Sequence, residues 1–439
     1  MHFDQAIMRS TRILTTMFVC LTSLLFFPTV SKSQSDVPRP EMLDAIFPVL
    51  RHILPPPPPL KVSLVRPTEQ PEKSACGLVP LNLVETRGRD TSIFKILGTP
   101  ASEQTNQPVE FLIKLQRLTV DADGSPRAYH PEDPFGRGVC DRSPTHGQAT
   151  GNICALDNLG NAGIRLFQGS QRITLYSKAG ADQHSEPNPD FTSVWGTLWA
   201  QIAKRQPQWV DLDALFGNAA PSNLRLYYSK DSNAAVIFDT DIIPFKDSYP
   251  CQSGAGSGHG YFVAATAPLP KAKSDLKQDA CSAASYLDPS RVPFFVLPGG
   301  VFQNLHVGDV AVAIAKVNDA DRLVFGMVGD IGPEDQIGEG SILLARELLG
   351  TVPEPKNSID LGNLDIKVQN TSSAVSSLAI LVLGGTAKYL AGNYTAKNIE
   401  KVGQTLLSKW ANDLPDRLEV CADAATANPL NGFQQPGPN

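Results

Sequence analysis

A strand, a chain reversal and a helix follow one another in the stretch Val324-Phe-Gly-Met-Val-Gly-Asp330-Ile-Gly-Pro-Glu-Asp-Gln-Ile-Gly-Glu339-Gly-Ser-Ile-Leu-Leu-Ala-Arg-Glu-Leu-Leu-Gly350. Val324 to Val328 is β-branched and aromatic, which predicts a buried strand, and Gly-Asp-Ile-Gly-Pro stops it, so Asp330 falls at the strand end. Gln336 to Gly338 then leads to Glu339. Ser341 is placed to cap a helix that ends at Gly350 and whose apolar face is Ile342, Leu344, Ala345 and Leu348. Two carboxylates nine residues apart thus flank one reversal beside glycines that leave room for a ligand, which suits acid/base chemistry.

The composition is that of an ordinary globular protein. Its 439 residues could form two average domains or one large mixed domain. A hydrophobic content of 42% and a formal charge of −6 give no basic bias toward nucleic acid. The mild acidity is compatible with a cationic substrate and is too weak to identify one.

The N-terminus has the pattern of a secretory signal. Arg9 and Arg12 precede an apolar run from Ile13 to Phe27, and Ser31 and Ser33 offer a cleavage site near Gln34. The alternative is a membrane anchor, but a spanning helix needs roughly 20 apolar residues. We therefore predict a signal peptide over residues 1–33 and a secreted, extracellular protein, or a periplasmic one in a bacterium.

Export changes how the cysteines are interpreted. Cys20 leaves with the signal, and six cysteines without a C-x-x-C pair then favour disulfides over zinc or a redox motif. We expect Cys140 to pair with Cys154, Cys251 with Cys281, and Cys76 with Cys421, although fifteen connectivities are possible.

Residues 34–75 are predicted to be a linker because they are rich in proline, with five in a row at Pro55 to Pro59. A packed N-terminal arm is the alternative, since Met42 to Leu54 is apolar. The folded domain is expected over residues 76–425, followed by a flexible tail over residues 426–439.

Two further acidic motifs lie upstream of Asp330. Asp121-Ala-Asp123-Gly124 follows a predicted strand and lacks the spacing of a calcium loop, so a structural turn or a substrate contact is favoured over a metal site. Leu224 to Tyr228 and Ala234 to Phe245 predict a hairpin, whose second arm would place Asp239 and Asp241 on one face.

The fold class predicted from these segments is mainly β with a few helices (α+β). Short apolar strands recur at close spacing in Arg291–Pro298, Val307–Ala315 and Leu378–Leu383, which indicates a β-barrel or packed sheets. A final helix is expected after Thr395, with Ile399, Val402, Leu406 and Trp410 facing inward.

The chain resembles the secreted chitosanases of glycoside hydrolase family 75 over roughly Phe111 to Trp410. The matching pieces, in the family's order, are Asp121-Ala-Asp-Gly-Ser-Pro-Arg-Ala-Tyr-His-Pro131, Leu156-Asp-Asn-Leu-Gly-Asn-Ala-Gly163, Phe238-Asp-Thr-Asp241, Gly260-Tyr-Phe-Val-Ala-Ala-Thr-Ala267, Val292-Pro-Phe-Phe-Val-Leu-Pro298, Gly329-Asp-Ile-Gly-Pro333 and Ile337-Gly-Glu-Gly-Ser341. The stretch from Ala179 to Leu215 and the glycine-rich loop after Cys251 depart from the family pattern.

The resemblance implies a hydrolase of polysaccharide degradation with a core like a six-stranded double-psi β-barrel. The essential pair of the family falls on Asp330 and Glu339, which would act by inversion, with no cofactor and no metal. The residues expected to bind chitosan, which is a polycation, are Asp239, Asp241, Tyr129, His130, Asp309, Glu334 and Asp335. The protein is expected to be a monomer that does not bind nucleic acid or, after signal cleavage, a membrane.

Two alternatives stay open at this stage. Related barrels cut peptidoglycan with a single Asp, which predicts murein cleavage that survives Glu339→Gln. A non-catalytic secreted carbohydrate-binding protein of the same fold would bind sugars without releasing reducing ends.

Overall fold

The computed structural model describes Val49 and residues 63–65, 78–87, 90–98, 110–125, 163–173, 188–217, 220–252, 262–267, 279–299, 302, 304–332, 337–350, 352–355, 361–368, 375–411 and 417–426. The described part is mainly β with a few helices, as predicted. The predicted signal peptide, residues 427–439 of the predicted tail, and the predicted pair Cys140 and Cys154 lie outside it.

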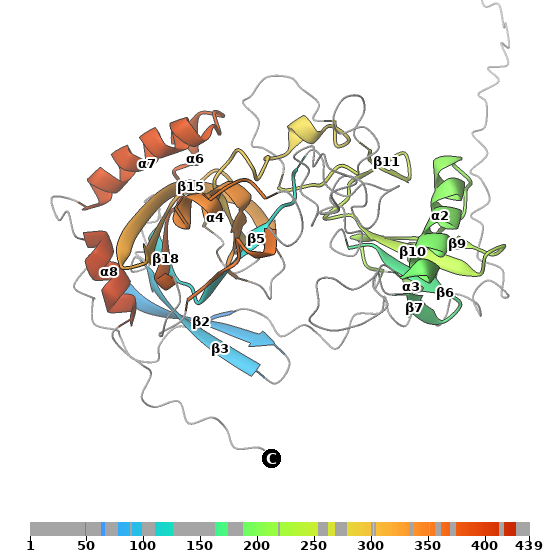
Figure 1. The fold of residues 1–439 in the computed structure, drawn as a ribbon, viewed down its shortest axis with the longest axis horizontal. Coiled ribbons are helices and arrows are strands. Elements are labelled where there is room, and N and C mark those ends of the chain that lie inside the picture. Colours follow the sequence, from blue (N-terminus) through green and yellow to red (C-terminus); the bar gives the residue numbers. More distant parts are fainter. Residues whose placement is uncertain are drawn as a thin grey trace, which may run out of the picture.

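The larger of the sheets has eleven strands and curls into a half-barrel, seen end-on in Figure 1. Its strand order is β1-β2-β3-β4-β18-β14-β15-β13-β16-β5-β17. The strands are β1 (Ser63–Val65), β2 (Val79–Arg87), β3 (Asp90–Gly98), β4 (Glu110–Lys114), β5 (Arg117–Asp121), β13 (Phe294–Pro298), β14 (Val310–Val317), β15 (Ala320–Gly332), β16 (Glu339–Ser341), β17 (Ile366–Lys367) and β18 (Val375–Leu383). Neighbouring strands are antiparallel except in the pairs β13–β15 and β16–β5.

Alternation along the strands builds one core on each face of the curled sheet. In β14, Ala311, Ala313 and Ala315 belong to the inner cluster, while Val310 and Val312 belong to the outer one. The outer face is covered by α7 (Ala396–Ala411) and α8 (Arg417–Thr426), which lie outside the curl in Figure 1. Ile399 and Trp410 of α7 are buried there as predicted, and each such side chain contributes about 1.5–3 kcal/mol.

Helix α4 (Ile342–Leu348) forms as its sequence predicts. The Ser341 hydroxyl accepts a hydrogen bond from the Leu344 amide at 3.3 Å, and Gly350 has a positive φ of 97° just past the helix end. The same hydroxyl accepts a second bond from the Phe294 amide at 3.0 Å. The start of α4 is therefore fixed to β13, while its apolar face packs into the inner cluster.

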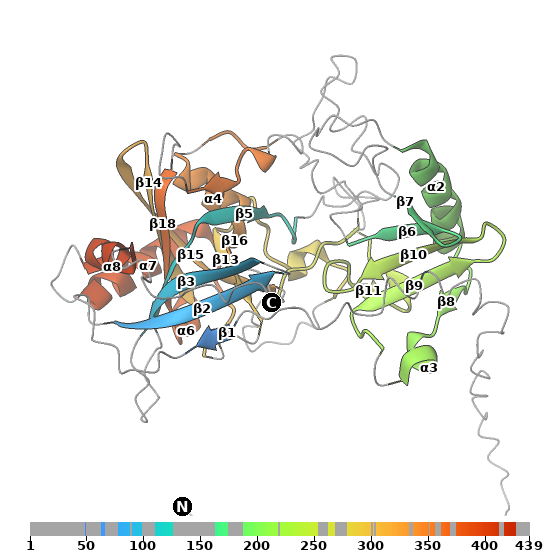
Figure 2. The same cartoon turned by 90° about the horizontal axis from the view of Figure 1, so that it is seen from below.

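A second sheet of five strands forms a smaller lobe, which stands apart from the curled sheet in Figure 2. Its order is β7 (Gln171–Ile173), β6 (Arg165–Gln168), β10 (Ala234–Asp239), β9 (Leu224–Ser229) and β8 (Trp209–Val210). The predicted hairpin is β9–β10. Helix α2 (Pro189–Ala203) packs Trp195 and Leu198 on one face of this sheet, and α3 (Leu212–Phe216) lies on the other.

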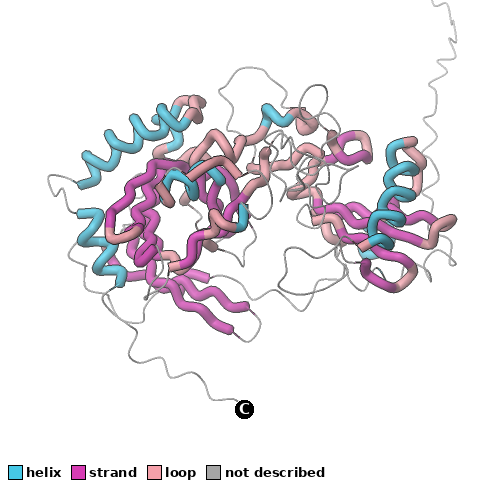
Figure 3. The backbone as a smooth tube through the Cα atoms, viewed as in Figure 1, coloured by secondary structure: helices cyan, strands magenta, loops and turns pink. Residues whose placement is uncertain are grey.

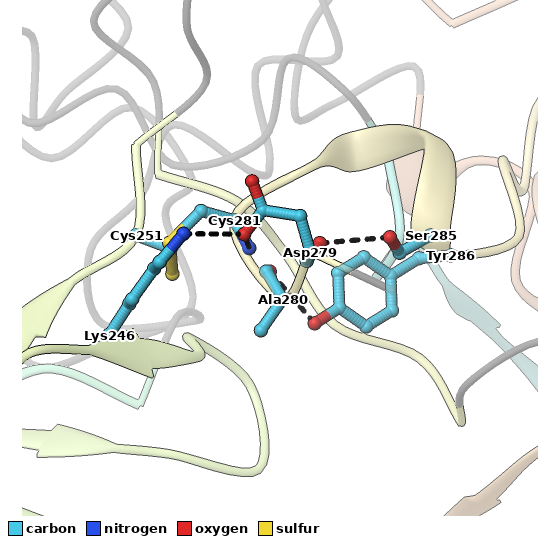
Figure 4. Close-up of a disulfide and its surroundings, with 7 residues drawn as sticks. All are labelled: Lys246, Cys251, Asp279, Ala280, Cys281, Ser285 and Tyr286. Carbon is cyan, nitrogen blue, oxygen red and sulfur yellow. Dashed lines mark hydrogen bonds and ion pairs between the residues drawn. A yellow bond between two sulfur atoms is a disulfide. The ribbon is translucent and has the colours of Figure 1, made fainter. Parts of the chain in front are cut away.

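The predicted disulfide between Cys251 and Cys281 is confirmed. It joins the end of the short hairpin β11 (Phe245–Lys246) and β12 (Tyr249–Pro250) to the segment after residue 278, and Figure 4 shows its surroundings. Asp279 accepts hydrogen bonds from Lys246 at 3.2 Å and from the Cys281 amide at 3.2 Å. Cys421 is also disulfide-bonded, to a cysteine outside the described residues, so its predicted pairing with Cys76 stays a prediction.

Two described pieces of the predicted linker pack against the fold. Val49 is buried in the cluster on the α3 side of the smaller lobe, and Ser63–Val65 pairs with β2. Packing of these pieces agrees with the alternative of a packed N-terminal arm. The tube in Figure 3 shows how few helices the described chain contains, and none of those helices is long and apolar enough to cross a membrane.

Candidate active site

Asp330 and Glu339 lie on either side of one strand. Val296, in β13, is the register partner of Asp330 in β15 and also of Glu339 in β16. Residues that are paired across neighbouring strands project from the same face of a sheet, so both carboxylates stand on the outer face of the curl, on which Val296 also lies. Two strand spacings of about 4.8 Å separate their backbones by roughly 10 Å.

A β-bulge turns Asp330 toward this face. The β13–β15 register shifts between Phe295, which pairs with Val328, and Val296, which pairs with Asp330, so Gly329 is the extra residue. In an unshifted register Gly329 would pair with Val296, and Asp330 would pair with Leu297 and point into the inner core. Only glycine fits at position 329, because a Cβ there would come within 2.4 Å of the Phe294 side chain. The strand also runs two residues beyond Asp330, to Gly332, rather than ending at it as predicted.

The Glu339 carboxylate reaches back across β13 toward β15. A Cβ at Gly332, two residues after Asp330 on the same face, would lie 2.9 Å from Val296 Cγ1 and 3.6 Å from Glu339 Oε2. The glycine therefore leaves space for the carboxylate. The Glu339 carboxylate thus lies on the β15 side of its own strand.

Asp330 is held through one of its two carboxylate oxygens. Its Oδ1 accepts hydrogen bonds from the Ala267 amide at 2.6 Å and from its neighbour Ile331 at 2.8 Å. Among the described residues no hydrogen bond to Oδ2 is found. Burial raises the pKa of Asp330 from 3.8 to about 6, since the two amide bonds that lower it are outweighed by burial and by the charges of Glu339 and Asp241. Oδ2 is thus the oxygen that can carry the proton, which Asp330 keeps up to about pH 6.

Asp121, whose motif was expected to form a structural turn or a substrate contact, adds a third carboxylate to the pair. It pairs with Ser341 of β16, and Thr119, two residues earlier, pairs with Glu339, so Asp121 projects from the same face as Glu339. Its Oδ1 accepts a bond from the Asp123 amide at 2.8 Å, which forms the predicted turn. Burial, together with the charges of Asp123, Asp330 and Glu339, raises the pKa of Asp121 well above its ordinary value. The register of β5 with β16 is the feature that brings Asp121 beside Glu339.

Asp239 and Asp241 do not share a strand as predicted. The strand β10 ends at Asp239, whose Oδ1 accepts bonds from the Asp241 amide at 3.0 Å and from Asn223 at 3.4 Å. Asp239 therefore holds the turn beside Arg165, whereas Asp241 is exposed and acts electrostatically on Asp330. Of the two, Asp241 is the one that the fold brings to the acid pair.

Asp309 lies in the interior instead of facing a substrate. It is fully buried, and its carboxylate accepts bonds from the amides of His306 at 2.9 Å, Thr386 at 2.8 Å and Ala387 at 3.0 Å. These bonds tie the turn before β14 to the start of α6 (Ala387–Leu390). No surface of Asp309 is left for a ligand, so we exclude it from the site.

The other predicted substrate residues, Tyr129, His130, Glu334 and Asp335, lie outside the described residues. Within the described ranges, no group of three or more His, Cys, Asp or Glu side chains is arranged to hold a metal ion. A cavity of about 600 Å³ lies between β15, α4 and α7, lined by Phe325, Arg346 and Lys397 among others, and none of the acidic residues discussed above lines it.

The raised pKa of Asp330 makes a prediction for stability. The native state keeps the proton of Asp330 up to about pH 6, whereas the unfolded chain releases it near pH 3.9. The contribution of protonated Asp330 to the free energy of unfolding is therefore fully present below about pH 3.9 and is lost as the pH rises through 6. The loss amounts to about 3 kcal/mol. Between pH 4 and 7 the free energy of unfolding in urea should fall more for the wild type than for Asp330→Asn, which should be the more stable protein at pH 7. If the free energy of unfolding falls equally with pH in the wild type and in Asp330→Asn, the prediction is contradicted.

A scan against protein-family models finds no match for this chain, and a search of curated proteins finds none either.

Proposed function

We propose that this protein is a secreted glycoside hydrolase that cleaves β-1,4 linkages of chitosan by an inverting mechanism with two carboxylates. One observation carries the proposal: Asp330 and Glu339, the positions of the family 75 motif pair, have the same register partner, Val296, and stand on one face of the sheet. The ordered motifs from Asp121 to Ser341 supply the substrate class, because they are the pieces that resemble the chitosanases.

Inversion is taken from the resemblance to the family, and it sets the carboxyl separation that the pair should have. An inverting enzyme needs its carboxyl groups about 6.5–9.5 Å apart so that one water molecule fits beside the sugar, whereas a retaining enzyme holds them about 5–5.5 Å apart. The backbones of Asp330 and Glu339 are roughly 10 Å apart, and the Glu339 side chain leans inward over Gly332. That lean places the Glu339 carboxylate on the Asp330 side of its strand, and the anomer of the first product tests whether the enzyme inverts.

The environment of each carboxylate supports an assignment of roles. Asp330 keeps its proton to about pH 6 and leaves Oδ2 without a described hydrogen bond, so it serves as the general acid that protonates the glycosidic oxygen. Glu339 then serves as the base that takes a proton from the attacking water on the opposite side of the sugar ring. Asp121 lies one strand beyond Glu339, on the side away from Asp330, so it is not the partner across the bond.

A cationic substrate suits the charges around the pair. The Asp330 carboxyl interacts electrostatically with three other acids, Asp121, Asp241 and Glu339. Glucosamine ammonium groups would relieve the repulsion among these like charges. The exposed Asp241 is the described residue best placed to meet such a group. Tyr129, His130, Glu334 and Asp335 remain proposed substrate contacts on sequence grounds.

Two finer predictions also belong to the proposal. A six-stranded double-psi β-barrel core is supported by the parallel pairs β13–β15 and β16–β5 and by the closeness in sequence of β4 and β5, which lie toward opposite ends of the sheet order. Secretion is supported by the predicted signal sequence and by the disulfide between Cys251 and Cys281.

The test is incubation of the mature protein with chitosan, chitin and murein, scored for new reducing ends. Chitosan cleavage is expected, and proton NMR of the first products should show the α-anomer that inversion of a β-linkage produces. Cleavage of murein alone would favour the peptidoglycan alternative, and sugar binding without new reducing ends would favour the non-catalytic one.

A further inference from the structure

We propose that Thr266 is a positioning residue for Asp330, and that residues 262–267, which we call the strap, thereby couple the smaller lobe to the general acid. Only the expected effect on kcat and KM rests on the function proposed above. The contacts that carry it are independent of the reaction.

The strap is anchored in the smaller lobe at its beginning. The Val263 amide donates to the Cys251 carbonyl at 2.9 Å, and the Ala265 amide donates to the carbonyl of Ile242 at 2.8 Å. Ile242 belongs to the turn that follows β10 and contains Asp241, and Cys251 is held by the disulfide to Cys281. The beginning of the strap is therefore hydrogen-bonded to the smaller lobe.

The strap meets the curled sheet at its other end. The Ala267 amide donates to Asp330 Oδ1 at 2.6 Å, which links the end of the strap to the carboxylate. Thr266, next to it, is 5% exposed, and its hydroxyl accepts a hydrogen bond from the Leu287 amide at 3.1 Å. Because the Thr266 carbonyl and the Ala267 N–H belong to one planar peptide unit, fixing Thr266 also fixes the direction of the N–H that holds Asp330.

Gly124 makes the close approach possible. A Cβ at Gly124 would lie 2.0 Å from the Leu287 carbonyl oxygen and 2.9 Å from Thr266 Cγ2, and the φ of Gly124 is +88°. Thr266 is therefore held from two sides, by the Leu287 amide and by the turn that follows Asp121. Thr266 thus contacts the turn after Asp121 of β5, and its neighbour Ala267 contacts Asp330 of β15.

Removal of the Thr266 hydroxyl should change the pKa of Asp330. A residue that only stabilised the fold would leave that pKa unchanged. The Ala267 amide lowers the pKa of Asp330, whereas burial, Glu339 and Asp241 raise it, and Asp330 in turn acts on Asp121 of β5. Loss of the fixed amide should therefore raise the pKa of Asp330 further, since fewer donors stabilise its charged form.

The experiment compares Thr266→Val, which cannot accept the Leu287 bond, with Thr266→Ser, which keeps the hydroxyl. The control is Thr197→Val on the exposed face of α2. The pKa of Asp330 is measured by carbon NMR of the labelled carboxyl, assigned by its absence in Asp330→Asn, and kcat and KM are measured on chitosan. Thr266→Ala repeats the measurement if the valine variant does not fold.

We expect Thr266→Val to raise the pKa of Asp330 and to lower kcat about 10- to 100-fold with little change in KM, because a misplaced acid costs turnover more than binding. Thr266→Ser and Thr197→Val should resemble the wild type. An unchanged pKa in folded Thr266→Val, or an equal loss in Thr266→Ser, would overturn the positioning role. If Thr266→Val raises the pKa of Asp330 but the wild type does not cleave chitosan, the positioning role is supported and the proposed hydrolase is refuted.

Discussion

Replacement of Asp330 by Asn should lower kcat on chitosan by about 10²- to 10⁴-fold, the usual contribution of a positioned general acid. Asparagine has the same shape and can still accept the amide bonds from Ala267 and Ile331, but it has no carboxyl proton to give to the leaving oxygen. KM should change little, because the substrate contacts remain. Initial rates of reducing-end release at several chitosan concentrations measure both quantities.

The matched control for this variant is Asp321→Asn. Asp321 is exposed, lies on the same strand and has no contact with the acid pair among the described residues, so its removal tests the chemical change alone. It should retain wild-type turnover. Full activity in Asp330→Asn would exclude Asp330 as the acid.

Replacement of Glu339 by Gln should have an effect of similar size for a different reason. Glutamine can fill the space above Gly332 that the carboxylate occupies, but it cannot take a proton from the attacking water. Turnover of chitosan should therefore fall by about 10²- to 10⁴-fold. The same reducing-end assay measures it, and Glu419→Gln, an exposed change on α8, is the control.

The Glu339 variant also separates the two enzymatic hypotheses. A barrel that cuts peptidoglycan with a single Asp would keep its murein activity after Glu339→Gln and lose it after Asp330→Asn. A two-carboxylate hydrolase loses chitosan activity in both variants. Retained chitosan cleavage by Glu339→Gln would leave Asp330 without its proposed partner.

Local sequence chemistry predicted several elements at and around the site. The strand into Asp330, the Ser341 cap, helix α4, the β9–β10 hairpin and the disulfide between Cys251 and Cys281 all appear as expected. Each of the backbone elements is decided by side chains within a few residues, such as a capping hydroxyl or a β-branched run. The sequence allowed many pairings of the cysteines, and it is the folded structure that shows Cys251 bonded to Cys281.

One error arose where a residue's surroundings come from a distant segment, and the other from a local turn. Asp309 looked like an acidic residue available to a substrate, but backbone amides near residues 306 and 386 enclose it. The run to Phe245 was expected to continue as a strand through Asp241, whereas β10 ends at Asp239, whose carboxylate stabilises a turn. The bonds to Asp309 from Thr386 and Ala387 cannot be inferred from spacing along the chain, whereas the turn at Asp239 is local and a strand pattern was favoured over it.

The sequence by itself determined the elements and the acidic residue types that this protein brings to chemistry, because periodicity, caps and turns act over a few neighbouring residues. The sequence also singled out Asp330 and Glu339 as a pair, and tertiary structure decided how they are oriented and which other acids join them. The bulge at Gly329 directs Asp330 to the face of Glu339, the register of β5 with β16 adds Asp121, and the strap places the amide of Ala267 on Asp330. The register of β5 with β16 and the bond from Ala267 to Asp330 join segments more than 60 residues apart, and no local pattern encodes that proximity.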